Sequence, residues 1–61
     1  MTKGNYTVHI EVAAGYQTYE CSYPVAWLDM KASTYIVLTL IDGKRLMVND
    51  FNVRSILEEK N

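Results

Sequence analysis

Hydrophobic and polar residues alternate along residues 5–12, which is the period of a β-strand with one buried face. Residues 16–23 predict a second strand after a turn at Ala14-Gly15. We therefore predict an N-terminal hairpin with one apolar face. Its cross-strand pairs would be Ile10 with Tyr19, Val8 with Cys21, and Tyr6 with Tyr23.

A second hairpin is predicted over residues 34–48, with its turn at Asp42-Gly43. Asp-Gly between apolar, β-branched runs is typical of a hairpin turn, and Gly43 takes a positive φ without steric cost. A two-residue loop would place the apolar residues of the two strands on opposite faces. A three-residue loop, 41–43, pairs Leu38 with Leu46 and Ile36 with Val48 on one face. We expect the three-residue loop, a type I turn followed by a glycine bulge, because a one-residue slip would expose a whole apolar set.

The other face of this second hairpin is unusually apolar for a solvent-facing surface. It would hold Tyr35, Val37, Thr39, Arg45 and Met47. Either the remaining strands cover this face, which we expect, or it is a binding or self-association surface.

The segments that flank the second hairpin have weaker patterns. Pro24 ends the preceding strand, because proline cannot donate to a ladder. Val25, Leu28 and Ala32 then have helical spacing, so we predict a loop with one or two helical turns over residues 24–33, in which Trp27 caps the core. Residues 53–58 fit either a short closing strand or a helix capped by Asp50. We favour the strand, with a frayed end at residues 59–61.

These patterns predict a single small domain over residues 1–61 that is all-β, or a β-rich α+β fold. The predicted architecture is a small antiparallel sheet or an SH3-like barrel, made of two hairpins joined by a short helical or irregular segment.

Residues 35–58 read Tyr-Ile-Val-Leu-Thr-Leu-Ile-Asp-Gly-Lys-Arg-Leu-Met-Val-Asn-Asp-Phe-Asn-Val-Arg-Ser-Ile-Leu-Glu. This order of strand, polar-glycine turn, strand, asparagine and Val-x-x-Ile resembles small FlbD-like flagellar proteins and the Sm-like and SH3-like barrels of bacteria and phages. The resemblance implies a small curved sheet or open barrel that binds protein or nucleic acid. It implies no enzymatic activity and assigns no functional residue.

Composition limits how this chain is stabilised. A domain of 61 residues buries only about 60% of its unfolded surface. One cysteine forms no intrachain disulfide, and one cysteine with one histidine cannot complete a tetrahedral zinc site. We therefore expect a homo-oligomer without metal or cofactor. The start of the sequence has no signal-peptide character and no apolar run is long enough for a bilayer, so we expect a cytoplasmic protein.

Few residues are candidates for chemistry. His9 shares a strand face with Glu11, and Glu20 would lie across from them, which is a general-base arrangement. No nucleophile or oxyanion donor accompanies them, so we expect a solvated strand histidine and no enzyme. Cys21 is expected to be a small buried hydrophobe rather than a reactive thiol, which would need an electropositive setting.

Aromatic residues are the stronger functional signal, with five tyrosines and one tryptophan in so short a chain. Tyrosine and tryptophan favour interfaces because they combine apolar area with a polar group. The predicted protein-binding residues are Tyr16, Tyr19, Tyr23, Trp27 and Tyr35. In the alternative, most of them complete a thin core.

The sequence thus favours a non-enzymatic protein-binding module, a small bacterial or phage regulator or inhibitor that docks on a larger protein. One alternative is a nucleic-acid-binding β-module in which Lys44, Arg45 and Arg54 contact phosphates beside Tyr35. The net charge of −1 argues against that alternative. A second alternative is a structural homo-oligomer whose aromatic surface lies between its own subunits.

Overall fold

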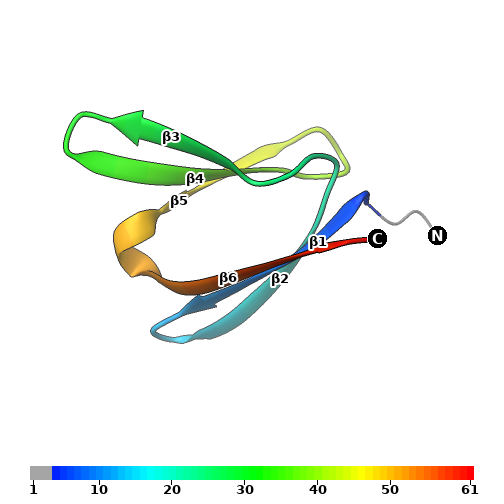
Figure 1. The fold of residues 1–61 in the computed structure, drawn as a ribbon, viewed down its shortest axis with the longest axis horizontal. Coiled ribbons are helices and arrows are strands. Elements are labelled where there is room, and N and C mark those ends of the chain that lie inside the picture. The colour runs from blue at the N-terminus through cyan, green and yellow to red at the C-terminus, as the bar shows by residue number, and fades with distance from the viewer. Residues whose placement is uncertain (1–3) are drawn as a thin grey trace.

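The computed structural model describes residues 4–61, and these residues form two antiparallel sheets of three strands each, which confirms the all-β prediction (Figure 1). In chain order the elements are β1 (Tyr6–Val12), β2 (Gly15–Cys21), β3 (Ala26–Met30), β4 (Ser33–Thr39), β5 (Arg45–Asn49), the 3₁₀ turn η1 (Asp50–Asn52) and β6 (Val53–Lys60).

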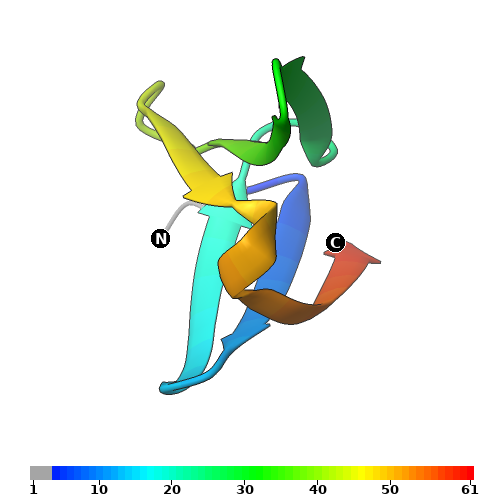
Figure 2. The ribbon, with the colours of Figure 1, turned by 90° about the vertical axis from the view of Figure 1, so that its left-hand side faces the viewer.

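The strand order is β2-β1-β6 in the first sheet and β3-β4-β5 in the second. The two sheets lie one above the other in Figure 1, where η1 leads from one to the other, and Figure 2 shows the same arrangement from the side. The two sheets also meet where the backbones of Cys21 and Leu40 form an isolated antiparallel β-bridge. Beside it, the Ser22 N–H donates to the Thr39 carbonyl over 2.8 Å. The fold is therefore two layers around one core rather than a single sheet.

The β4–β5 hairpin has the predicted register. Leu38 lies opposite Leu46 and Ile36 opposite Val48. The loop is closed by a hydrogen bond from the Gly43 N–H to the Leu40 carbonyl, 2.9 Å, and by one from the Leu40 N–H to the Lys44 carbonyl, 2.8 Å. Gly43 has a φ of +88°, as the bulge position requires.

The N-terminal hairpin forms, but its predicted register is wrong by two residues. Val8 lies opposite Tyr19, and Tyr6 lies opposite Cys21. The chain reverses at residues 13–14, where neither alanine has a positive φ, and Gly15 is already the first residue of β2, with a φ of +139°. Because a shift of two residues preserves the side-chain alternation, the predicted apolar face of β1 is correct although the pairs are not.

The prediction of helical turns in residues 24–33 is wrong. Residues 26–30 form β3, which pairs with β4 and places Trp27 opposite Ile36. Lys31, with a φ of +58°, begins the turn into β4. The helical spacing did not decide the structure, because β4 offers a free row of backbone partners that a short isolated helix would lack.

The C-terminal strand is confirmed, whereas the frayed end is not. β6 runs beside β1 as far as Lys60, and the Asn61 N–H still donates to the Asn5 carbonyl over 2.9 Å. Asn49 rather than Asp50 caps the intervening turn, since its side chain accepts from the Phe51 N–H over 2.9 Å. Pairing with β1 holds the end of the chain in place.

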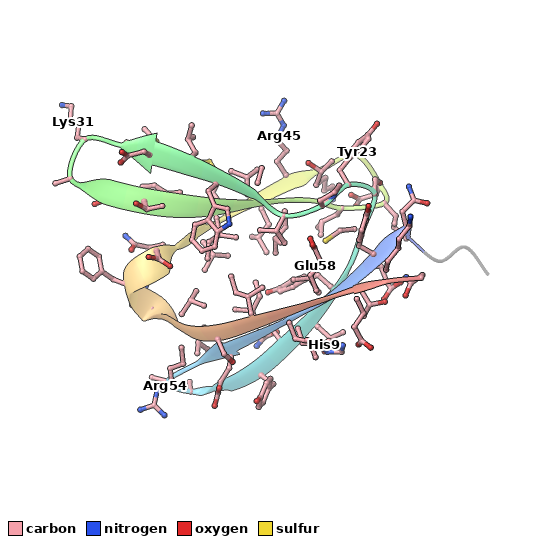
Figure 3. The ribbon with its side chains drawn as sticks, viewed as in Figure 1. His9, Tyr23, Lys31, Arg45, Arg54 and Glu58 are labelled. Atoms are coloured by element: carbon pink, nitrogen blue, oxygen red, sulfur yellow. The ribbon has the colours of Figure 1, made fainter. Side chains whose placement is uncertain are left out.

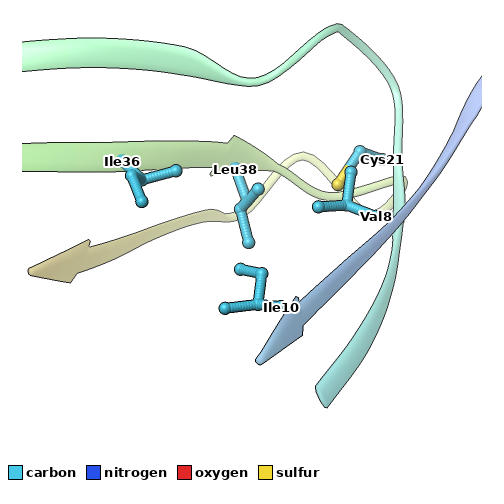
Figure 4. Packing of buried hydrophobic residues seen from close by; sticks show 5 residues of the cluster. All are labelled: Val8, Ile10, Cys21, Ile36 and Leu38. Carbon is cyan, nitrogen blue, oxygen red and sulfur yellow. The ribbon is translucent and has the colours of Figure 1, made fainter. Parts of the chain in front are cut away.

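The core lies between the two sheets and draws on both. Its fully buried side chains are Val8, Ile10, Cys21, Ile36 and Leu38 (Figure 4). Partly buried apolar residues surround them: Tyr6, Val12, Tyr19, Val25, Leu40, Leu46, Val48, Val53 and Ile56. Both predicted apolar strand faces, those of β1 and of the β4–β5 hairpin, thus pack against each other.

We expect the Gly43→Ala variant to be destabilised by about 1 kcal/mol or more. Apart from Gly43 and its two chain neighbours, no residue has a heavy atom within 4 Å of the Cβ that the substitution adds, so the cost comes from the positive φ and not from a clash. A urea titration monitored by circular dichroism measures it, with Lys44→Ala in the same loop as the control. Equal stability of Gly43→Ala and the wild type would contradict this assignment of the turn.

The opposite change is expected at the β3–β4 turn. Lys31→Gly should stabilise the domain by about 0.5 kcal/mol, because glycine adopts a positive φ without the strain that a side chain imposes there. Ala32→Gly is the matched control, since the φ of Ala32 is not positive and glycine there only increases the entropy of the unfolded chain. Thermal unfolding of both variants checks the sign of each effect.

Candidate functional site: the outer face of the second sheet

The second sheet has one face on the core and one face directed away from it. Residues that lie directly opposite each other in the ladder share a face, so the outward positions follow from the register. We call their surface the outer face; it comprises Ala26, Leu28, Met30, Ser33, Tyr35, Val37, Thr39, Arg45, Met47 and Asn49.

No other element covers the outer face among residues 4–61. The exposed fractions are 43% for Leu28, 50% for Met30 and 47% for Met47. None of the partly buried residues that pack on the core belongs to this face, and the first sheet lies on the opposite side of the second (Figure 1). The expectation that the remaining strands cover this face is therefore wrong, because β3 widens the sheet instead of covering it.

The charge on this face is low and of one sign. Among the outward strand positions, all of which lie in the described part of the chain, Arg45 alone carries a charge. Figure 3 shows Arg45 projecting from the second sheet away from the first, with Lys31 at the tip of the β3–β4 hairpin. The outer face is thus an apolar surface with a cation on its margin.

The five predicted contact aromatics do not form one surface. Tyr35 lies on the outer face, whereas Tyr19 lies opposite Val8 and packs on the core. Tyr16 lies on the outward face of the first sheet, opposite Glu11, and Tyr23 is exposed in the loop before β3. Trp27 shares the inner face with Ile36 yet is 58% exposed, so it does not cap the core as predicted.

Leu28 and Met30 belong to this surface although they were not among the predicted contact residues. The signal was present, since residues 26, 28 and 30 are all apolar and alternate with Trp27 and Asp29. The competing helical spacing of residues 25, 28 and 32 obscured it.

The basic residues proposed for phosphate contacts are dispersed. Arg45 and Arg54 lie on opposite sides of the molecule in Figure 3. The Lys44 ammonium lies 3.9 Å from the Asp42 carboxylate, and Tyr35 pairs with Asn49 instead of Arg45. The predicted cluster of Lys44, Arg45 and Arg54 beside Tyr35 is therefore not formed.

His9 belongs to a polar network on the outward face of the first sheet. Its Nε2 lies 2.8 Å from Glu59 Oε1, and its Nδ1 lies 3.2 Å from Thr18 Oγ1. Glu11 instead accepts from the Ser55 hydroxyl over 2.9 Å, and Glu20 accepts from the Thr7 hydroxyl over 3.0 Å. His9 on β1 thus contacts both β2 and β6. Its carboxylate partner is Glu59, and not Glu11 or Glu20 as expected.

Cys21 is fully buried between the sheets, as predicted. Burial raises the pKa of its thiol, and the nearby Glu20 and Glu58 carboxylates raise that pKa further. The site therefore favours the neutral thiol over the nucleophilic thiolate.

Within residues 4–61, no three His, Cys, Asp or Glu side chains are placed to hold a metal ion, and these residues enclose no pocket. In that same range, no helix has both the length and the apolar character needed to cross a membrane.

Neither a protein-family model, nor a curated protein, nor a solved structure matches this chain. The resemblance of residues 35–58 to FlbD-like, Sm-like and SH3-like proteins therefore stays a prediction.

The raised thiol pKa predicts an alkaline loss of stability. The contribution of Cys21 is fully present below the ordinary thiol pKa and is lost as the pH rises above it, because only the unfolded state then ionises. Between about pH 8 and about pH 10, we expect the free energy of unfolding to fall more steeply in the wild type than in Cys21→Ala. Urea titrations across this range measure both slopes, and parallel slopes would contradict the buried neutral thiol.

Proposed function

We propose that this protein is a non-enzymatic protein-binding module that docks on a larger protein through the outer face of its second sheet. The observation that carries the proposal is the half-exposed, uncovered state of Leu28, Met30 and Met47 on one continuous sheet face. Contiguous exposed apolar surface on a soluble domain is characteristic of interaction sites.

The composition of the outer face also fits a protein partner. Tyrosine, methionine and arginine are enriched at the centres of protein interfaces, and this face has Tyr35, Met30, Met47 and Arg45. Methionine adapts its shape to the opposing surface more readily than branched residues do. The complementary partner surface is apolar, with a carboxylate placed to meet Arg45.

Nucleic acid is the weaker candidate partner on electrostatic grounds. The formal net charge is −1, and the basic residues do not gather beside a stacking ring. We accordingly place this module among small regulators or inhibitors, which act by occupying a surface of their target.

An affinity capture from the lysate of the source organism, run with and without nuclease, tests the proposal. Capture of a single protein in stoichiometric amount, unchanged by nuclease, is the expected result. Recovery that collapses on nuclease treatment would overturn the protein-binding proposal in favour of nucleic acid.

Met47→Lys is expected to abolish this capture or to weaken it about tenfold or more, because it places a second charge on the apolar outer face. Leu57→Lys is the matched control: Leu57 is similarly exposed, at 59%, but it lies on the outward face of the first sheet, where Leu57 pairs with His9. Circular dichroism checks that both variants fold. If both bind as the wild type does, or if both lose binding equally, the outer face is not the docking surface.

A further inference from the structure

Among residues 4–61, no strand lies beside the outer edge of β3. β3 is the terminal strand of its sheet and lies at the margin of the molecule in both ribbon views (Figures 1 and 2). All five of its residues are exposed. An unpaired edge of this kind is a template for a further strand.

The hydrogen-bond pattern identifies which backbone groups face this edge. Thr39 of β4 accepts from Ser22 on the β3 side, whereas the next residue, Leu40, bonds towards β5. The odd-numbered residues of β4 therefore bond to β3, and their ladder partners there are Ala26, Leu28 and Met30. The N–H and C=O groups of Trp27 and Asp29 consequently point outward to the free edge.

The position before Trp27 on the same edge is already occupied. The Val25 N–H points outward as well, and it donates to the Glu58 carboxylate of β6. The groups that remain for a further strand are thus those of Trp27 and Asp29.

We propose that a second copy of this chain pairs with this edge, β3 antiparallel to β3, about a two-fold axis at Leu28. Trp27 then lies opposite Asp29 of the second copy, and each exchanges both of its free backbone groups with the other. This inference goes beyond the proposed function and does not rest on it, because it depends only on the edge of β3.

Two neighbouring registers also align outward-bonding residues, but both are worse. An axis at Asp29 would place the two Asp29 carboxylates directly opposite each other, which is destabilising. An axis at Trp27 would place Asp29 opposite Val25, whose N–H is already bonded to Glu58. Only the axis at Leu28 uses every free group without opposing like charges.

The side chains of β3 are self-complementary in this register. On the outer face, Leu28 lies opposite Leu28 of the second copy, and Ala26 lies opposite Met30. On the inner face, the indole of Trp27 lies opposite the Asp29 carboxylate, which accepts from its N–H. The pairing therefore brings exposed apolar side chains of β3 into lateral contact across the two-fold axis, while their sheet face stays open.

Pairing also changes the docking surface. The second sheet of one copy and the second sheet of the other join into one sheet in the order β5-β4-β3-β3-β4-β5, and their outer faces become continuous. The edge of β6 is a poorer alternative, because Glu58, Glu59 and Lys60 are consecutive charges along it.

Sedimentation equilibrium of wild type, Asp29→Pro and Asp29→Ala tests the proposal. Proline removes an edge N–H that no ladder bond of the monomer uses, so the domain still folds, as circular dichroism verifies. We expect Asp29→Pro to raise the dimer dissociation constant about tenfold or more relative to Asp29→Ala, which loses the carboxylate but keeps the N–H. A wild type that is monomeric at every concentration, or equal dimerisation of the two variants, would overturn the proposal.

Oxidation of Leu28→Cys tests the register. Residue 28 of each copy would form a pair without ladder hydrogen bonds, with Cα atoms about 4.5 Å apart, which is within disulfide range. A covalent dimer is expected for Leu28→Cys and not for Met47→Cys. Residue 47 lies on the same outer face, but on β5, the edge strand farthest from the β3 edge. Equal cross-linking of the two variants would overturn the register.

Met47→Lys should remain dimeric, so failure of the docking proposal and failure of the dimer proposal give different results.

Discussion

Everything in this fold depends on one layer of apolar side chains held between two small sheets. Five side chains of residues 4–61 are fully buried, and they come from both sheets. A chain of 61 residues has only enough strand to close one such layer, so each sheet contributes one face to the core and leaves the other face outside. The side chains at the outward positions consequently give each of those two faces its character.

The two outward faces differ sharply. On the first sheet, the Thr7 hydroxyl bonds to Glu20 and to Asn61, just after β6. His9 contacts Thr18 of β2 and Glu59 of β6. On the second sheet, most of the corresponding positions are alanine, leucine, methionine, valine or tyrosine, and the polar ones are a serine, a threonine, an asparagine and one arginine. The polar side chains of the first face bond to one another, and its exposed Tyr16 and Leu57 each lie opposite a polar residue, Glu11 and His9. The second face instead has contiguous apolar area that only another surface can remove from water. This asymmetry is the main reason for assigning binding to the second sheet.

The edges of the sheets show a similar contrast. The outer edge of β6 is lined by charged residues, and Glu58 also bonds across to the start of β3. β3 has one charged residue, Asp29, and its remaining side chains are apolar on both faces. The edge of β6 is thus protected by charge, whereas the edge of β3 has free backbone groups. The open edge of β3 adjoins the outer face, because Leu28 and Met30 belong to both.

What the sequence determined is what short-range chemistry controls. Asp42-Gly43 and the flanking alternation defined the β4–β5 register, because only one loop length puts Leu38 with Leu46 and leaves Gly43 at a positive φ. The alternation also defined the apolar face of β1. The tertiary structure decided the rest, since β3 is a strand only because β4 offers it backbone partners, and Lys60 is ordered only because β1 lies beside it. The uncovered outer face and the His9–Glu59 contact depend on which strands become neighbours, and a local pattern does not contain that information.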